Sequence, residues 1–576
     1  MIKDQAMHYD SLSAYKFKSP NIFDFFSILI IFSVFTLFSW GASHLSTPYH
    51  LGAPIPIYLD YLSLISYSLK TFTRMILAMS LSVLVTFIVG SVLAKNQRMR
   101  SILLPIIDVL QSLPPLGISA FIFVFCMLLF PKSYIGLELA SILTTFFSQV
   151  WNMILSFYQS IVTIPKELEE ATEIYHLSRW QRFWKLEVPR ATPGLILNSM
   201  VSMSASWFFV VASEAFSIAD QRILIPGIGS YIAQAINLAN NQAVSMAFAA
   251  MFLVILMYDQ LLFRPLLAWS EKFKEEIVDD EQYNNSWFFD LLSRSHLFEN
   301  IAILFEIISN LFPTSKRKTI PKEIISKNSP LLNNFYLFLE IAFYGLVLIL
   351  FSRLLYFFLN SFTAKELLYT LKLGGITAIK VMLVVSISML IWVPVGVMIG
   401  SNAKIATFFQ PIIQFLAACP PQMLYPLLYP LIVHHHLNVD IWTAPIMIAG
   451  TQWYILFNVI AGSMMITKEQ RFVAANFGLK GWLLWRRLYL PAIIPYCITG
   501  AMAAAGGCWN VSIDSDTVEW GSTKIQALGI SSYIHQAKFD GDFDRILLGM
   551  AVMAFYVIVI NRLIWNKLFE KVSAYR

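Results

Sequence analysis

The chain has 576 residues, of which 57% are hydrophobic and 13% are charged, and its formal net charge is +6. Soluble domains are about 45–50% apolar and about 25% charged, and one soluble core stops growing at about 250–300 residues, so this composition excludes a soluble globular enzyme. The small net charge, with basic residues in short groups beside apolar runs, disfavours nucleic-acid binding. At about 20 residues for each transmembrane helix, the chain can supply on the order of a dozen membrane spans.

The apolar runs form two sets of six, separated by a charged stretch. The first set lies near 22–42, 73–94, 116–130, 137–164, 195–216 and 243–265, and the second near 335–360, 377–400, 422–433, 441–466, 494–513 and 546–568. The run at 22–42 is too long for a cleaved signal sequence, so we predict a retained span there. The apolar segment at 298–312, inside the charged stretch, is short, which favours an interfacial or packed helix.

The two sets repeat one another. At an offset of 306, Arg74 matches Lys380 and the segment PIIDVLQSLPP at 105–115 matches PIIQFLAACPP at 411–421. From Trp151 onward the offset is 302 and continues without a gap to GIGSYI and GISSYI, at 227–232 and 529–534. Repeated coincidence of infrequent tryptophans and prolines indicates two homologous halves. Because six is an even number of spans, both halves insert the same way round.

Basic residues near the span ends predict the orientation. They follow the second and fourth spans of the first half and the fourth span of the second half, and such loops are cytoplasmic. We therefore predict an all-α polytopic membrane protein, with two six-helix bundles in parallel orientation and both termini in the cytoplasm. Its regions are a cytoplasmic segment 1–21, a first transmembrane domain 22–268, a charged cytoplasmic linker 269–334 and a second transmembrane domain 335–576.

The loop after the fourth span of each half has the pattern of two short helices. In the second half, Thr467 and Gln470 have capping-box spacing, and Gly478 is suited to the left-handed conformation at a helix end. A second short helix is predicted from about Trp482 to Leu488, ended by Pro491. In the first half Pro165 is expected to start the first helix, as a first-turn proline does, and His176 occupies the position of Gly478.

These loops resemble a known motif. Glu170-Ala171, His176 and Leu186-Glu187-Val188-Pro189 resemble the EAA loop of permease subunits of ABC importers, and Phe472-Val473-Ala474, Gly478 and Leu490-Pro491 are similar. The stretches from Trp207 to Glu214 and on to GIGSYI resemble permeases of the nitrate, sulfonate, taurine and bicarbonate group. The resemblance covers both six-span halves and implies a type I importer permease fold in the bacterial inner membrane, for a small, anionic solute. It also implies that the loops dock on ATPase subunits through Glu170, Ala171, His176, Pro189, Ala474, Gly478, Leu490 and Pro491.

Neither loop carries the full motif. Only the first half keeps the glutamate, Glu170, whose counterpart is Phe472, and only the second half keeps the glycine, Gly478. We therefore expect the two loops to grip their ATPases unequally. The alternative interpretation is that both are ordinary surface loops.

The chain lacks the GxxxxGK[ST] loop that cradles nucleotide phosphates. We therefore predict a permease rather than an enzyme, with no cofactor bound by this chain and with ATP and magnesium on two cytoplasmic ATP-binding subunits. The resemblance implies an extracytoplasmic solute-binding protein as a further partner. One alternative is a secondary active transporter driven by an ion gradient. Another is a membrane enzyme, for which the sequence offers no convergent nucleophile and base and no metal shell.

Ionisable residues within apolar runs are costly and therefore candidates for function. Arg74 and Lys380 could attract an anionic solute, or their charges could snorkel to the interface. Glu214, Asp514 and Asp516 could line a pathway or gate, or could cap helix ends and pair with neighbours.

Other polar and special residues have weaker patterns. Ser206, with Ser199, Ser202 and Ser204, and Asn510 with Ser512, could line the pathway or allow close helix packing. Histidines 434–436 lack the companions of a metal shell, and cysteines 126, 419, 497 and 508 lack CxxC spacing, so we predict no metal site. The proline pairs at 114–115 and 420–421 are expected to break the helices that enter the third and ninth spans.

Overall fold

The computed structural model describes residues 55–112, 114–131, 133–218, 221–273, 286–295, 330–521 and 523–565, together with Asn21, Asp24, Phe25, Lys567, Leu568 and Lys571. The predicted span at 22–42 lies outside these residues apart from two positions, and the segment 298–312 lies outside them entirely. Most of the predicted linker lies outside them as well.

The first half is a succession of helices with one hairpin near its end. Its elements are α3 (Tyr61–Lys95), α4 (Gln97–Ser112), α5 (Pro115–Leu129), α6 (Tyr134–Val162), α7 (Lys166–Ile174), α8 (Arg179–Arg182), the π-helical turn η1 (Phe183–Glu187), α9 (Val188–Glu214), β1 (Ala215–Ile218), β2 (Gln221–Leu224), α10 (Ile228–Asn237), α11 (Asn241–Tyr258), η2 (Asp259–Phe263), α12 (Arg264–Ser270), η3 (Glu271–Phe273) and α13 (Trp287–Ser293). Strands β1 and β2 pair antiparallel, with Ala215 opposite Leu224.

The second half repeats most of this order. They are α16 (Pro330–Ser361), α17 (Ala364–Gly400), α18 (Ala403–Ala418), η4 (Pro421–Leu424), α19 (Tyr425–His434), α20 (Val439–Trp442), α21 (Ala444–Met464), α22 (Lys468–Asn476), α23 (Gly481–Leu484), the π-helical turn η5 (Trp485–Tyr489), α24 (Leu490–Ser515), β3 (Thr517–Trp520), β4 (Thr523–Gln526), α25 (Ile530–Asp540), α26 (Phe543–Ile560) and η6 (Asn561–Trp565). Strands β3 and β4 also pair antiparallel.

The matching boundaries confirm the duplication that the sequence predicts. Helices α7 and α22, helices α11 and α26, and strands β1 and β3 begin and end at the same offset of 302 residues. Backbone conformations repeat too, because His176 and Gly478 both have positive φ angles, of 50° and 65°. The two halves therefore share one architecture, including the turns that end α7 and α22.

The described residues contain eight helices that are long and apolar enough to cross a membrane, or nine if the bent pair Ile412–Ala418 and Pro421–His434 forms one span. The all-α, polytopic fold is therefore confirmed, whereas the number of twelve spans is not. The third and ninth runs account for part of the difference. The third is the short helix α5, and the ninth is bent by 92° at its proline pair. Pro114 and Pro420 are the N-cap residues there, so the prolines interrupt the helices as predicted.

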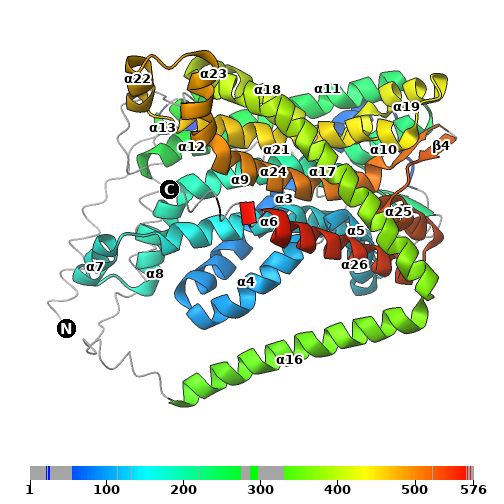
Figure 1. Ribbon diagram of the computed structural model, residues 1–576, viewed down its shortest axis with the longest axis horizontal. Helices are drawn as coiled ribbons and strands as arrows, with labels where there is room; N and C mark the ends of the chain where they lie inside the picture. Colours follow the sequence, from blue (N-terminus) through cyan, green and yellow to red (C-terminus); the bar gives the residue numbers. More distant parts are fainter. Residues whose placement is uncertain are drawn as a thin grey trace.

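The two halves lie the same way round. Helices α7 and α8 of the first half and α22 and α23 of the second project at the left of Figure 1, whereas α10, α25 and β4 lie at the opposite end. Helix α16 runs apart from the bundle along the lower edge of that view. The parallel orientation predicted from the even number of spans is therefore confirmed for the described helices.

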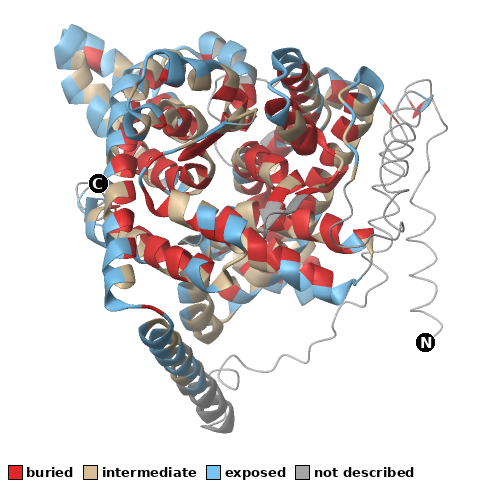
Figure 2. Ribbon diagram, turned by 90° about the vertical axis from the view of Figure 1, so that its right-hand side faces the viewer, coloured by how far each residue is buried: buried red, intermediate tan, exposed pale blue. Residues whose placement is uncertain are grey.

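The core interlocks the halves. Leu116 and Phe123 of α5 pack in a cluster with Trp509 of α24, whereas Phe415 of α18 packs with Trp207 of α9. Figure 2 shows buried residues where the helices meet and exposed ones on the outside of the bundle. Because each half contributes a helix to the core of the other, the space between them lies inside one packed unit.

Candidate functional site

Local backbone chemistry shapes both predicted coupling loops. In the second loop, the Thr467 hydroxyl accepts from the Gln470 amide and the Gln470 side chain accepts from the Thr467 amide, both at 3.3 Å, so the predicted capping box is confirmed. Gly478 and His176 end α22 and α7 in the left-handed conformation, also as predicted. Pro165 differs, because it is the N-cap residue of α7 rather than its first helical residue.

Pro491 does not end the second short helix of its loop, which corrects the prediction. Helix α23 continues through η5 into α24, so that Gly481–Ser515 is one uninterrupted helix, and Arg179–Glu214 is its counterpart. A proline lacks an N–H and clashes with the carbonyl four residues earlier. The π-helical turns, with i→i+5 bonding, end two positions before Pro189 and Pro491, so that both prolines lie in the first turn of the α-helix that follows.

Each loop is tied to the membrane helices, but by different groups. In the first half, the buried carboxylate of Glu187 pairs with Lys95 at 2.8 Å and Arg182 at 3.4 Å, and Arg182 also pairs with Glu169 at 2.5 Å. In the second half, Arg471 occupies the position of Glu169 and donates to the Ser401 carbonyl at 2.7 Å and the Ser463 carbonyl at 3.2 Å. Cations suit the C-terminal ends of helices, and Arg471 holds α22 against the ends of α17 and α21.

Each loop exposes large apolar side chains among its polar ones. Tyr175 and Phe477, which precede His176 and Gly478, are 77% and 79% exposed. Trp482 and Phe472 are also exposed. The remaining motif residues divide between the faces, since Glu170, His176, Gly478, Leu490 and Pro491 are exposed, Ala171 and Pro189 are half-buried, and Ala474 is buried. Exposed apolar patches of this kind are typical of protein interfaces.

A buried cluster of ion pairs lies at the end of the first half opposite α7 and α8. The guanidinium of Arg74 pairs with both oxygens of Glu138, at 2.6 and 2.7 Å, and with Glu214 at 2.5 Å. The Thr71 hydroxyl donates to Glu214 at 2.7 Å and accepts from the Ile228 amide, the first residue of α10, at 2.9 Å. We call this arrangement the first clasp, because it joins α3, α6, α9 and α10.

A second clasp repeats the arrangement with fewer charges. Lys380 pairs with Asp516 at 2.8 Å, and the Thr377 hydroxyl accepts from the Ile530 amide at 3.0 Å. All four charged groups of the Arg74–Glu214 and Lys380–Asp516 pairs are buried. The snorkelling expected as one alternative is therefore wrong, whereas the pairing expected as an alternative for the acidic residues is what the structure contains.

Sequence reasoning missed Glu138, the bidentate partner of Arg74. A carboxylate inside an apolar run is itself a signal, because an ionisable residue there normally has a partner in the bundle. Lys538 was missed too; it is buried and donates to the Leu116 carbonyl at 2.6 Å.

The serines of α9 pack between helices. Ser206 donates to the Ser202 carbonyl at 2.8 Å and its hydroxyl lies 2.9 Å from that of Ser148 on α6. Asn510 is half-buried and donates to the Gly506 carbonyl at 3.1 Å. Close packing, the alternative to pathway lining, accounts for Ser206.

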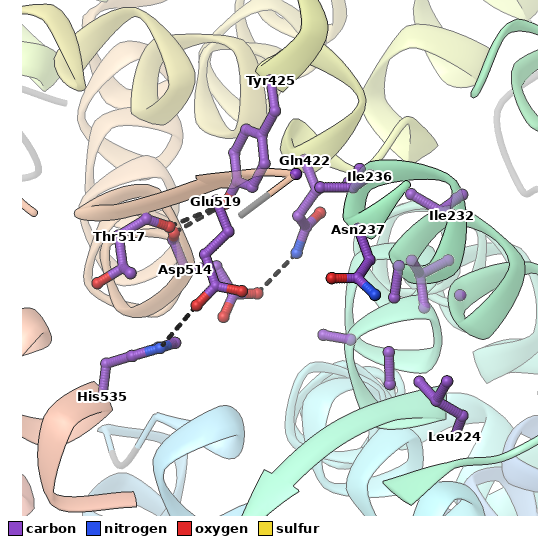
Figure 3. Close-up of a pocket in the computed structure, with 16 residues that line it drawn as sticks. Leu224, Ile232, Ile236, Asn237, Gln422, Tyr425, Asp514, Thr517, Glu519 and His535 are labelled. Carbon is purple, nitrogen blue, oxygen red and sulfur yellow. Dashed lines mark hydrogen bonds and ion pairs between the residues drawn. The ribbon is translucent and has the colours of Figure 1, made fainter. Parts of the chain in front are cut away.

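A cavity of about 160 Å³ lies between the halves (Figure 3), at the end of the bundle opposite α7 and α22 (Figure 1). Of the predicted pathway residues it brings in Asp514 alone, while Arg74, Lys380, Ser206, Glu214, Asn510 and Asp516 do not line it. The lining residues are Val211, Ala212, Ala215, Leu224, Gly229, Ile232, Ala233, Ile236, Asn237, Gln422, Tyr425, Asp514, Thr517, Glu519, Gly521 and His535.

No group of three or more His, Cys, Asp or Glu side chains that could hold a metal ion occurs among the described residues. Histidines 434–436 are exposed at the end of α19. The four cysteines are free thiols, three of them buried.

Comparison with known families decides what this architecture is. The model of the family described as "Binding-protein-dependent transport system inner membrane component" matches residues 82–262 and 392–565, one region in each half and together more than half of the chain. The chain belongs to this family. It is a fused, duplicated member of a family of inner-membrane transport components, and its apolar helices agree with a multi-pass membrane protein.

Individual relatives within this family are distant. The bicarbonate transport system permease protein CmpB of Synechococcus elongatus is 25% identical over 179 residues, which cover 31% of this chain and 61% of the relative. The nitrate import permease protein NrtB of Leptolyngbya laminosa is 25% identical over 157 residues, covering 27% and 51%. The glycine betaine transport system permease protein OpuAB of Bacillus subtilis is 23% identical over 180 residues, covering 31% and 58%. The matches thus span between about half and three fifths of each relative.

Proposed function

We propose that this chain forms the solute pathway of an ATP-driven importer and that its two loops couple the pathway to separate ATP-binding subunits. Membership of the family supports this proposal, as do the names of relatives that are permeases of bicarbonate, nitrate and glycine betaine transport systems. In this proposal ATP and magnesium act on the partner subunits, and this chain binds no cofactor.

The observation that carries the proposal is the repeated device at one end of the bundle. Each half presents a short helix with an exposed aromatic residue, Tyr175 or Phe477, followed by a helix that continues through the bundle. Two such surfaces suit two cytoplasmic partners. The unequal motif residues, Glu170 against Phe472, lead us to expect unequal grips on them.

The remaining assignments follow from this arrangement. If the loops face the cytoplasm, the cavity faces outward, where an extracytoplasmic solute-binding protein would deliver its cargo. Both termini and the linker 269–334 then belong on the cytoplasmic side, with transmembrane domains at 22–268 and 335–576. The names of the bicarbonate and nitrate relatives support a small anionic solute, whereas the glycine betaine relative supports a zwitterion.

Reconstitution tests the proposal. The full chain, purified with the ATP-binding subunits encoded beside it, should hydrolyse ATP only in their presence and should take up solute into vesicles only with ATP. Uptake driven by an ion gradient without ATP would instead identify a secondary transporter.

Labelling of single cysteines tests the orientation independently. Lys185 and Arg486 are exposed positions of the two loops, and Lys185→Cys and Arg486→Cys should both be modified from the cytoplasmic side. Modification from opposite sides would contradict the parallel arrangement on which two equivalent ATPase sites depend.

A further inference from the structure

The cavity lies on the axis that relates the two halves. Three pairs of its lining residues are equivalent positions at the offset of 302, namely Ala212 and Asp514, Ala215 and Thr517, and Ala233 and His535. Equivalent residues can face one cavity only where the halves meet around their shared axis. If two similar bundles enclose a solute pathway, that pathway runs along the axis between them. A solute that crosses the membrane would therefore pass through this cavity.

The cavity is polar on one side only. At each of the three axis-related pairs the first half supplies alanine and the second half supplies a polar side chain, Asp514, Thr517 or His535. Of the lining residues that the structure describes in the first half, Asn237 has the one polar side chain and none is charged. This asymmetry departs from the duplication and gives a bound solute a single preferred orientation.

Two buried polar atoms on the polar side of the cavity have no hydrogen-bond partner within the described residues. Thr517 is 3% exposed and lines the cavity, yet its hydroxyl has no hydrogen-bond partner within the described residues. Gln422 donates to the Asp514 carboxylate at 2.6 Å, but its own carbonyl oxygen lacks a partner in the same part of the chain. Buried polar groups normally find a partner, so these two atoms point to a ligand or water between the halves.

The charges that line the cavity are negative. Asp514 and Glu519 are carboxylates, and among the described residues that line the cavity there is no lysine or arginine (Figure 3). Two lysines, Lys524 and Lys538, lie near the cavity without lining it, whereas His535 lines it. Lys538 donates to the Leu116 carbonyl at 2.6 Å, while Lys524 and His535 each lie 3.9 Å from Glu519. An anion entering here would meet these carboxylates, with no lysine or arginine among the described lining residues to receive it.

We propose that the axis cavity binds a small solute through a positively charged ammonium-type group, held by Asp514 and Glu519 against the ring of Tyr425. A carboxylate attracts a cation strongly where water is excluded, and a tyrosine face adds cation–π attraction. At about 160 Å³ the cavity is smaller than the roughly 300–1,000 Å³ of drug-sized ligand pockets, which restricts the solute to a few heavy atoms around that group. This proposal rests on the pathway function and assigns its solute class a cationic or zwitterionic character.

Equilibrium binding to the purified full chain in detergent tests the site. Choline and glycine betaine are the cationic and zwitterionic probes, and nitrate and bicarbonate are the anionic ones. We expect choline or glycine betaine to bind and the anions not to, and we expect Asp514→Asn to weaken that binding at least tenfold. Asp544→Asn removes an exposed carboxylate of α26 outside the cavity and should leave binding unchanged.

Asp514→Asn could weaken binding by disturbing the fold, so Glu519→Gln is a second variant. Glu519 is partly exposed, and this variant should weaken binding while the chain elutes in size-exclusion chromatography as the wild type does. Binding of nitrate or bicarbonate alone, binding of no probe, or cation binding that survives both substitutions would overturn the proposal. Those results would leave the importer function standing if ATP-binding subunits still co-purify. If the ATP-binding subunits fail to co-purify while the chain still binds the cation, the importer function is contradicted and the cation site is not.

Discussion

Lys380 in α17 and Asp516 at the end of α24 form a buried ion pair 2.8 Å long, in the place where Arg74 pairs with Glu214 in the first half. Loss of one partner leaves an uncompensated buried charge, which typically costs about 3–5 kcal/mol. Lys380→Met should therefore lower the stability of the chain by about that amount in thermal unfolding in detergent. Lys372→Met, at an exposed position of the same helix, is the matched control and should have little effect.

A double substitution separates the ion pair from packing. If the unpaired carboxylate causes the instability, Lys380→Met with Asp516→Leu should recover most of the lost stability, since apolar replacements of buried pairs are often neutral. A double variant as unstable as the single one would show that the second clasp acts through something other than charge.

Arg471 should determine how firmly α22 is held. Its guanidinium bridges the Ser401 and Ser463 carbonyls, so Arg471→Ala should let the amides of α22 exchange hydrogen at least tenfold faster, as measured by mass spectrometry. Arg487→Ala, an exposed arginine of the same loop, should leave that rate unchanged. Equal protection in both variants would mean that packing alone positions the helix.

The exposed aromatics of the second loop should carry much of the ATPase affinity. Buried aromatic anchors at interfaces are commonly worth about 2 kcal/mol or more, and about 1.4 kcal/mol is tenfold in affinity. Phe477→Ser and Trp482→Ser should each reduce retention of the ATP-binding subunits more than tenfold in pull-down. Leu528→Ser, at an exposed apolar position of the opposite end, should retain them fully, and unchanged retention in all three variants would exclude this face as the interface.

Lys538 predicts a pH dependence of stability. It lies in α25, outside the candidate spans, and burial lowers its pKa from 10.5 to about 8 although Asp514 opposes the shift. Between about pH 8 and 10.5 the unfolded chain therefore binds a proton that the folded chain has released, so the free energy of unfolding rises with pH across this window.

Paired melting curves isolate this effect. The difference in melting temperature between the wild type and Lys538→Met should change in favour of the wild type as pH rises from 7.5 to 10. Lys372→Met, at an exposed position of α17, is the matched control. A flat difference for Lys538→Met would contradict a lowered pKa.

The sequence predicts the local architecture of this chain well, because local chemistry decides it. The capping box at Thr467, the left-handed ends at His176 and Gly478, and the breaks at Pro114 and Pro420 each depend on residues only a few positions apart. The repeat then extends each such prediction from one half to the other.

What the sequence could not predict depends on contacts between distant segments. Arg74 and Glu138 are 64 residues apart, and Lys538 and Leu116 are 422 apart. No periodic pattern in the sequence predicts which of these distant residues contact one another. The one-sided cavity is a further example, since only the packing of the halves brings Ala212 opposite Asp514. Pro491 was misjudged because its effect depends on whether a π-helical turn precedes it.

The helix Arg179–Glu214 has 36 residues without interruption, and Gly481–Ser515 has 35. At 1.5 Å per residue each is a stiff rod about 50 Å long. In the proposed function, one end of each rod is the foothold for an ATP-binding subunit, and the other ends beside Ala215 or Thr517 in the cavity wall. In the proposed importer, a displacement at the foothold therefore arrives at the cavity as a displacement of its wall. Through these continuous helices, the nucleotide cycle of the ATP-binding subunits would be coupled to the shape of the cavity without any intervening loop.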